Sequence, residues 1–83
     1  MKSEKNHIDA SLIDLGKRIR HLRERKGYSQ ETLGFKAGLH RNYISKLELA
    51  QKNPTYTTLI KLSNALEVNI EDLIKDKRDV IQG

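Results

Sequence analysis

The side chains best suited to specific chemistry lie in one short segment, residues 41–48, RNYISKLE. Read as a helix, the segment places Ile44 and Leu47 on one apolar face, three residues apart. The polar side chains that face the other way are those of Arg41, Asn42, Ser45 and Lys46. An arginine can donate two parallel hydrogen bonds to guanine, and an asparagine can pair with adenine in the same bidentate way. We therefore predict base contacts from Arg41 and Asn42, the plain alternative being a solvated polar helix face.

Six further polar residues could support such a face. We also predict a base contact from Lys46, which can reach guanine or a phosphate, and the hydroxyl of Tyr43 can donate to a phosphate. Gln30 opens a helix whose free N–H groups could hold a phosphate with its amide. The residues predicted to contact phosphate are Gln30, Tyr43, Ser45, Asn53 and Thr55. Asn53 and Thr55 are equally explained as turn and cap residues, and Tyr43 could instead lie against the neighbouring helix.

Two short helices separated by a glycine must position these side chains. The first, residues 30–37, carries Leu33 and Ala37 on one face, and the second runs from about residue 40 to 49. Gly38 between them can adopt a positive φ without steric cost and so end the first helix. Gly34 has no side chain, which allows a second helix to cross closely. The spacing predicts a helix-turn-helix.

Flanking segments show the same helical period. A helix near the N-terminus should begin at about Ser11. That serine would cap it, and Asp14, three residues later, would complete a capping box by bonding back to the backbone of the cap residue. It should end at Gly27, and Ser29 should cap the next helix. Later helices are expected at residues 56–66 and at 70 to about 75, capped by Thr55 and Asn69, the latter with Asp72 as box partner. No stretch alternates with period two, so we expect an all-α fold without a sheet. In these flanking helices, the residues predicted to face the core of the domain are Leu12, Leu15, Ile19, Leu22, Leu59, Leu62, Leu66 and Leu73.

The segment 30–49 resembles the DNA-binding helix-turn-helix of the phage repressor and Cro type, the XRE family. The matching residues are Gln30, Gly34, Gly38 and Glu48, and the likeness extends from about residue 15 to 73. Within that family, GLHRNYIS at residues 38–45 is most similar to the controller proteins of restriction-modification systems. The resemblance implies a five-helix bundle of the phage-repressor-like type, in which the second helix of the motif enters the major groove.

The resemblance also implies roles for individual residues. An arginine at Arg23 would meet Glu48 in a structural ion pair at the end of the second motif helix. Relatives commonly carry glycine where Ala50 stands, so another residue, Asn53, is expected to adopt the strained conformation of that loop. Glu31 stands where some phage repressors present an acid to RNA polymerase, although the helix dipole explains it equally well. Restriction-modification controllers activate their own operon and repress it at high concentration.

The length, charge and composition of the chain limit the classes of protein to which it could belong. Eighty-three residues fit one small domain, which we place at 11–76 between tails at 1–10 and 77–83. The net charge of +5 and the isoelectric point near 9.6 favour an acidic partner such as nucleic acid. No cysteine is present, no apolar run is long enough for a membrane span, and no signal segment is recognisable, so we expect a cytoplasmic protein.

Nothing in the sequence indicates catalysis. His7, His21 and His40 lack metal-ligand spacing, so no zinc site is expected. Neither a glycine-rich phosphate loop nor a nucleophile elbow is present, so we expect no enzyme and no cofactor.

The sequence thus predicts a transcription regulator that binds double-stranded DNA as a homodimer on a near-palindromic operator. The predicted dimer interface comprises Val68, Ile70 and Ile74, together with Val80 and Ile81 of the tail. These residues could instead complete the core of a single chain. Two alternatives remain open for the function: an antitoxin-like or adaptor module that binds a protein, and an RNA-binding adaptor.

Overall fold

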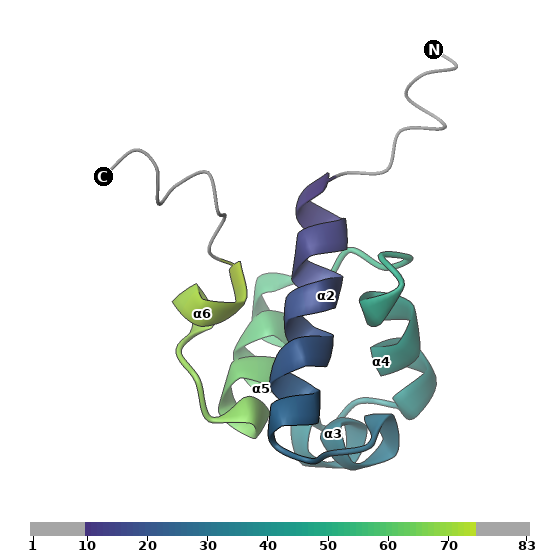
Figure 1. The fold of residues 1–83 in the computed structure, drawn as a ribbon, viewed down its shortest axis with the longest axis vertical. Coiled ribbons are helices and arrows are strands. Elements are labelled where there is room, and N and C mark those ends of the chain that lie inside the picture. Colours follow the sequence, from purple (N-terminus) through teal and green to yellow (C-terminus); the bar gives the residue numbers. More distant parts are fainter. Residues whose placement is uncertain (1–9, 75–83) are drawn as a thin grey trace.

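The computed structural model describes residues 10–74, and all of the regular structure in this range is helical. The helices are α2 (Ala10–Arg25), α3 (Gln30–Ala37), α4 (Arg41–Glu48), α5 (Tyr56–Leu66) and α6 (Ile70–Ile74). Figure 1 shows α2 along the middle of the molecule, with α4 on one side, α5 and α6 on the other, and α3 across its lower end. The predicted all-α fold with five helices is confirmed for this part of the chain.

The first helix begins earlier than predicted. Ala10 already lies in α2, so Ser11 is inside the helix and the prediction that it caps the N-terminus is wrong. The other end agrees with the prediction, because α2 stops at Arg25 and Gly27 has a φ of +76°. The N–H of Tyr28 then donates to the carbonyl of Arg23 at 3.1 Å, which closes the turn towards α3.

Ser29 and Thr55 cap α3 and α5 as the sequence predicts, and at α6 the bond from the predicted partner Asp72 is present. The hydroxyl of Ser29 accepts from the N–H of Thr32 at 3.0 Å, and the hydroxyl of Thr55 accepts from the N–H of Thr58 at 3.2 Å. At α6 the carboxylate of Asp72 accepts from the N–H of Asn69 at 3.1 Å. These bonds satisfy amides that have no partner within their own helix.

One hydrophobic core receives side chains from every described helix. Its buried members are Leu15, Ile19, Leu33, Ala37, Ile44, Leu47, Leu62, Leu66 and Leu73. Three predicted core residues, Leu12, Leu22 and Leu59, are only partly buried and pack against it. Each fully buried leucine or isoleucine contributes about 1.5–3 kcal/mol of transfer free energy, so packing of amphipathic faces holds these short helices in place.

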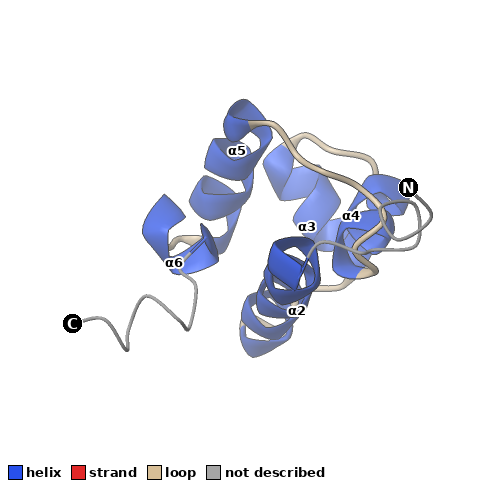
Figure 2. Cartoon of the chain, turned by 90° about the horizontal axis from the view of Figure 1, so that it is seen from above, coloured by secondary structure: helices blue, strands red, loops and turns tan. Residues whose placement is uncertain are grey.

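Two contacts fix α2 against helices that are distant in the sequence. A Cβ atom at Gly16 would lie 2.6 Å from the carbonyl oxygen of Leu47 and 2.8 Å from that of Glu48, so the backbones of α2 and α4 nearly touch. On the other side of α2, Arg18 Nη1 donates to the carbonyl oxygen of Leu73 in α6 at 2.7 Å. Figure 2, seen from above, shows α2 between α4 and α6. This arrangement determines the direction in which α4 projects.

The predicted tails fall largely outside the described range. Residues 1–9 and 75–83 are not described, and Ala10, which the sequence placed in the N-terminal tail, forms the first residue of α2. Within residues 10–74, no helix is both long enough and apolar enough to cross a membrane.

Candidate nucleic-acid interface

The turn between α3 and α4 has the geometry of a tight helix-turn-helix. Gly38 ends α3 with a φ of +72°, and the N–H of Leu39 donates to the carbonyl of Gly34 at 2.8 Å. A Cβ atom at Gly34 would lie 2.5 Å from the carbonyl oxygen of Leu39 and 3.2 Å from the nitrogen of Arg41. The space that Gly34 leaves is therefore filled by the turn and by the first residue of α4, and not by the middle of a crossing helix.

An imidazole caps the start of α4. Nδ1 of His40 accepts from the N–H of Asn42 at 3.0 Å, so His40 takes the place of the serine or threonine that usually holds this position. Regular helix then runs from Arg41 to Glu48, one residue shorter at each end than the predicted range 40–49. The cap fixes the first turn of α4, which carries Arg41 and Asn42, two of the three residues predicted to contact bases.

The outer face of α4 carries the predicted polar residues. Arg41, Asn42 and Lys46 are exposed, whereas Tyr43 and Ser45 are partly buried. The opposite face buries Ile44 and Leu47 in the core. Two long cations and an amide therefore project from the side of α4 that faces solvent, where they could reach base edges or phosphates.

Arg41 has a partner that the sequence did not suggest. Its Nη1 atom lies 3.4 Å from Oε1 of Glu31, in the first turn of α3. The two residues are ten positions apart on different helices, so no helical spacing rule links them. Together with Asn42 they border an open hollow of about 450 Å³ whose other lining residues are Phe35, Leu39 and His40.

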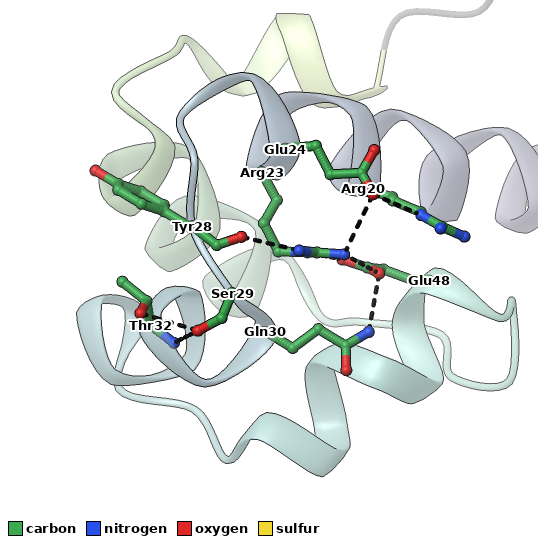
Figure 3. Close-up of polar contacts among 8 residues, drawn as sticks. All are labelled: Arg20, Arg23, Glu24, Tyr28, Ser29, Gln30, Thr32 and Glu48. Carbon is green, nitrogen blue, oxygen red and sulfur yellow. Dashed lines mark hydrogen bonds and ion pairs between the residues drawn. The ribbon is translucent and has the colours of Figure 1, made fainter.

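A buried polar cluster holds the far end of α4 (Figure 3). Arg23 Nε donates to Glu48 Oε2 at 2.6 Å and Arg23 Nη2 donates to Glu48 Oε1 at 3.0 Å, so the ion pair implied by the family resemblance is present. Arg23 Nη1 also donates to the carbonyl of Tyr28 at 2.9 Å. The hydrogen bond with Glu48 raises the pKa of Arg23 above its already high ordinary value, so the guanidinium stays charged.

Gln30 belongs to the same cluster. Its Nε2 atom donates to Glu48 Oε1 at 3.0 Å, and Figure 3 shows the amide pointing at the carboxylate. Glu48 thus accepts three hydrogen bonds, two from Arg23 and one from Gln30, which compensates for burying its charge. The structure assigns Gln30 a supporting contact with the end of α4, and its predicted phosphate contact stays a prediction.

The loop after α4 differs from the sequence prediction. Ala50 itself has a φ of +62°, and Asn53 does not have a positive φ, so the prediction that Asn53 takes the strained position is wrong. The N–H of Ala50 donates to the carbonyl of Leu47 at 3.1 Å, which closes the end of the helix whatever the side chain is. Asn53 lines a second hollow of about 230 Å³, bordered also by Leu12 and Leu73. Thr55 is exposed and serves as the cap of α5.

The residues predicted to form a dimer interface have different environments. Val68 is partly buried and packs against the core of its own chain, and Ile70 is also partly buried. Ile74 keeps 51% of its surface exposed at the end of α6. Val80 and Ile81 lie outside the described residues. Of the described members of this set, Ile74 is therefore the one that presents a large apolar surface to solvent.

Metal binding receives no support from the described part of the chain. Across residues 10–74, no group of three or more histidine, cysteine, aspartate or glutamate side chains could hold a metal ion. His40 is used as a helix cap, and His21 lies exposed on α2.

Solved structures with the same fold include DNA-associated regulators. The restriction-modification controller protein C.AhdI from Aeromonas hydrophila superposes with a TM-score of 0.76 at 42% identity, covering 77% of this chain and 97% of that one. The biofilm regulator SinR in complex with DNA gives a TM-score of 0.70 at 39% identity, covering 74% and 98%.

Sequence comparison leads to the same group of proteins. The transcriptional regulator SinR of Bacillus subtilis is 38% identical over 66 residues, which are 78% of this chain and 60% of SinR. This chain therefore spans only about 60% of that relative's length. The control protein C.BamHI of Bacillus amyloliquefaciens is 38% identical over 60 residues, 71% of this chain and 74% of the relative. These names are those of regulators and not of enzymes. The helix-turn-helix family model HTH_3 matches residues 19–73, and the chain therefore belongs to this XRE-type helix-turn-helix family.

Proposed function

We propose that this protein binds double-stranded DNA in a sequence-specific manner and regulates transcription. The observation that carries the proposal is the face of α4, where Arg41, Asn42 and Lys46 project into solvent. The helix is held at its start by the His40 cap and at its end by the ion pair of Glu48 with Arg23. Helix-turn-helix proteins place the N-terminal residues of such a helix against base edges in the major groove. The net charge of +5 favours association with a polyanion.

Support for the assignment also comes from the relatives. A protein at 39% identity has been solved in complex with DNA, and a restriction-modification controller matches at 42% identity over nearly its whole length. We propose that this chain is a regulator of the controller type, which would act in the cytoplasm where its operator lies. Contact of Glu31 with RNA polymerase would then make it an activator, and run-off transcription of the Glu31→Lys variant on a saturated operator tests that contact.

Homodimerisation forms part of the proposal. One α4 contacts only a few base pairs, and two helices related by a two-fold axis give the longer site that good specificity needs. The exposed Ile74 of α6, next to the partly buried Ile70, offers an apolar surface on the side of the molecule away from α4. A two-fold dimer would place its two α4 helices about 34 Å apart on a near-palindromic operator.

The experiment is selection of binding sites from random duplex DNA at a fixed, near-physiological salt concentration. We expect a short inverted repeat whose half-sites lie one helical turn apart. Recovery of a single motif without symmetry would contradict the proposed two-fold dimer. Recovery of no motif from the folded protein would refute sequence-specific binding and favour the alternative, an antitoxin-like or adaptor module for a protein partner. Competition between duplex DNA and RNA in the same assay distinguishes DNA binding from the RNA-binding alternative.

A further inference from the structure

The ion pair between Glu31 and Arg41 joins the first turns of α3 and α4. The carboxylate and the guanidinium lie 3.4 Å apart, and their side chains are 75% and 62% exposed. Both border the open hollow at the start of α4, together with the amide of Asn42. An acid therefore lies beside the residue that we assign to base reading, on a surface that is proposed to meet a polyanion.

We propose that Glu31 is a specificity-determining residue that positions the guanidinium of Arg41 for guanine, a step that rests on the proposed function. The contact uses Nη1, at one edge of the guanidinium. The opposite edge, formed by Nε and Nη2, still carries the two parallel donors that O6 and N7 of guanine accept. Holding one edge restricts the rotamers of a long side chain, so less freedom is lost when the other edge meets a base.

The same carboxylate lowers affinity for the wrong sequences. An unpaired Arg41 would bind any nearby phosphate, which adds affinity but no sequence information. With Glu31 beside it, the charge of Arg41 is partly offset, and the carboxylate repels phosphates that approach closely. Guanine keeps its advantage because its two acceptors match the free edge of the guanidinium. Glu31 therefore increases the ratio of specific to non-specific binding in two ways: it favours the contact of Arg41 with guanine, and it weakens the contact of Arg41 with phosphates.

The pair is exposed, so it biases the arginine and does not lock it. Ion pairs in water are weak and are screened by salt. Approach of DNA would remove water from the hollow and strengthen every charged contact within it. The effect of Glu31 should accordingly appear in discrimination between DNA sequences, with little change in the stability of the free protein.

The test compares Glu31→Gln with the unchanged protein on three duplexes: the selected operator, the operator with the guanine opposite Arg41 replaced by adenine, and a scrambled sequence. We expect discrimination at that base pair to fall about three- to tenfold, less than the loss of a whole bidentate contact would cause. Affinity for the scrambled duplex should rise. Glu71→Gln is the matched control, because Glu71 is also an exposed acid in the first turn of its helix, α6, and its loss removes the same charge.

A double-mutant cycle with Arg41→Ala isolates the pair. If Glu31 acts through Arg41, then Glu31→Gln leaves discrimination unchanged in the Arg41→Ala background. Equal effects in both backgrounds, or an effect matched by Glu71→Gln, would overturn the inference. The proposed function fails separately, when Arg41→Ala alone alters neither affinity nor discrimination. If Arg41→Ala reduces discrimination and Glu31→Gln does not, only the role of Glu31 is refuted.

Discussion

Arg23 and Glu48 form a bidentate ion pair between α2 and the end of α4, with two hydrogen bonds of 2.6 and 3.0 Å. Only 11% of the arginine side chain and 5% of the glutamate side chain are exposed. A bidentate pair tolerates little rotation of either partner. It therefore fixes the orientation of α4 relative to α2, and Arg23 extends the restraint to the following turn through the carbonyl of Tyr28.

Removal of one partner should destabilise the fold strongly. Arg23→Met leaves the carboxylate of Glu48 buried without its main donor, at an expected cost of about 3–5 kcal/mol in the free energy of unfolding, measured by urea denaturation. The double variant Arg23→Met, Glu48→Leu should recover much of this loss, because no unpaired charge remains. A double variant no more stable than Arg23→Met would show that the unpaired charge is not the cause.

Base and phosphate contacts should respond differently to truncation. Arg41→Ala should cost about 1–3 kcal/mol of binding free energy on the selected operator and relax the preference at one base pair. Gln30→Ala should weaken binding to all sequences alike, because a phosphate contact carries no sequence information. It should also lower the stability of the free protein, since Glu48 loses one of its three donors. Binding isotherms on operator and scrambled duplex distinguish the two patterns, and an unchanged operator affinity for Arg41→Ala would contradict the assigned reading face.

Close approach of α2 to α4 makes Gly16 sensitive to substitution. In Gly16→Ala the new Cβ atom would lie within 2.8 Å of two backbone carbonyl oxygens, neither of which belongs to a flexible side chain. The helices must then move apart, at an expected cost of about 1–3 kcal/mol in thermal or urea unfolding. Lys17→Ala, at the neighbouring exposed position, serves as the control and should be nearly neutral. A stabilised Gly16→Ala protein would mean that the helices can separate freely.

The positive φ of Ala50 is a source of strain that glycine relieves. A left-handed conformation costs a non-glycine residue about 1–2 kcal/mol, and glycine loses about 0.5–1 kcal/mol through its more flexible unfolded state. Ala50→Gly should therefore stabilise the protein by about 0.5–1 kcal/mol. Gly38→Ala tests the reverse change, because the added Cβ meets nothing within 4 Å and only the backbone at φ +72° opposes it. Calorimetry should show opposite shifts of the melting temperature, and shifts of equal sign would contradict the strain argument.

Lys26 and Glu67 should contribute stability only over a limited pH range. Their hydrogen bond raises the pKa of Lys26 above its ordinary 10.5 and lowers the pKa of Glu67 below its ordinary 4.5. The contribution of Glu67 is present above pH 4.5 and lost as the pH falls through its lowered pKa. That of Lys26 is present below pH 10.5 and lost as the pH rises through its raised pKa.

The variant Lys26→Met should consequently melt at a lower temperature than the unchanged protein near neutral pH. The difference should disappear well below pH 4.5, and it should also shrink at high salt because both groups are exposed. A difference that persists at low pH would mean that the methylene groups of Lys26, and not its charge, stabilise the protein.

Local sequence determined most of the helical framework. Ser29 and Thr55 cap their helices through their own hydroxyls, and Gly27 and Gly38 end helices because they adopt a positive φ at no steric cost. Leu33 of α3 and Ile44 and Leu47 of α4 could be assigned to the core because helical spacing places each on the apolar face of its own helix. Arg41, Asn42 and Lys46 follow from the same geometry, as the residues opposite that face.

Tertiary structure alone decided the contacts between elements. The close backbone approach at Gly16 depends on which helix crosses α2, and the pairing of Glu31 with Arg41 depends on the angle between α3 and α4. Ala50 adopts the strained conformation because the backbone bond to Leu47 and the path into α5 fix that position more firmly than side-chain preference does. Local propensities are worth about 1 kcal/mol per residue, and the packing of a whole core outweighs them. The sequence could therefore specify which residues form helices and which side chains face outward, whereas the partner of each side chain depended on how the helices pack.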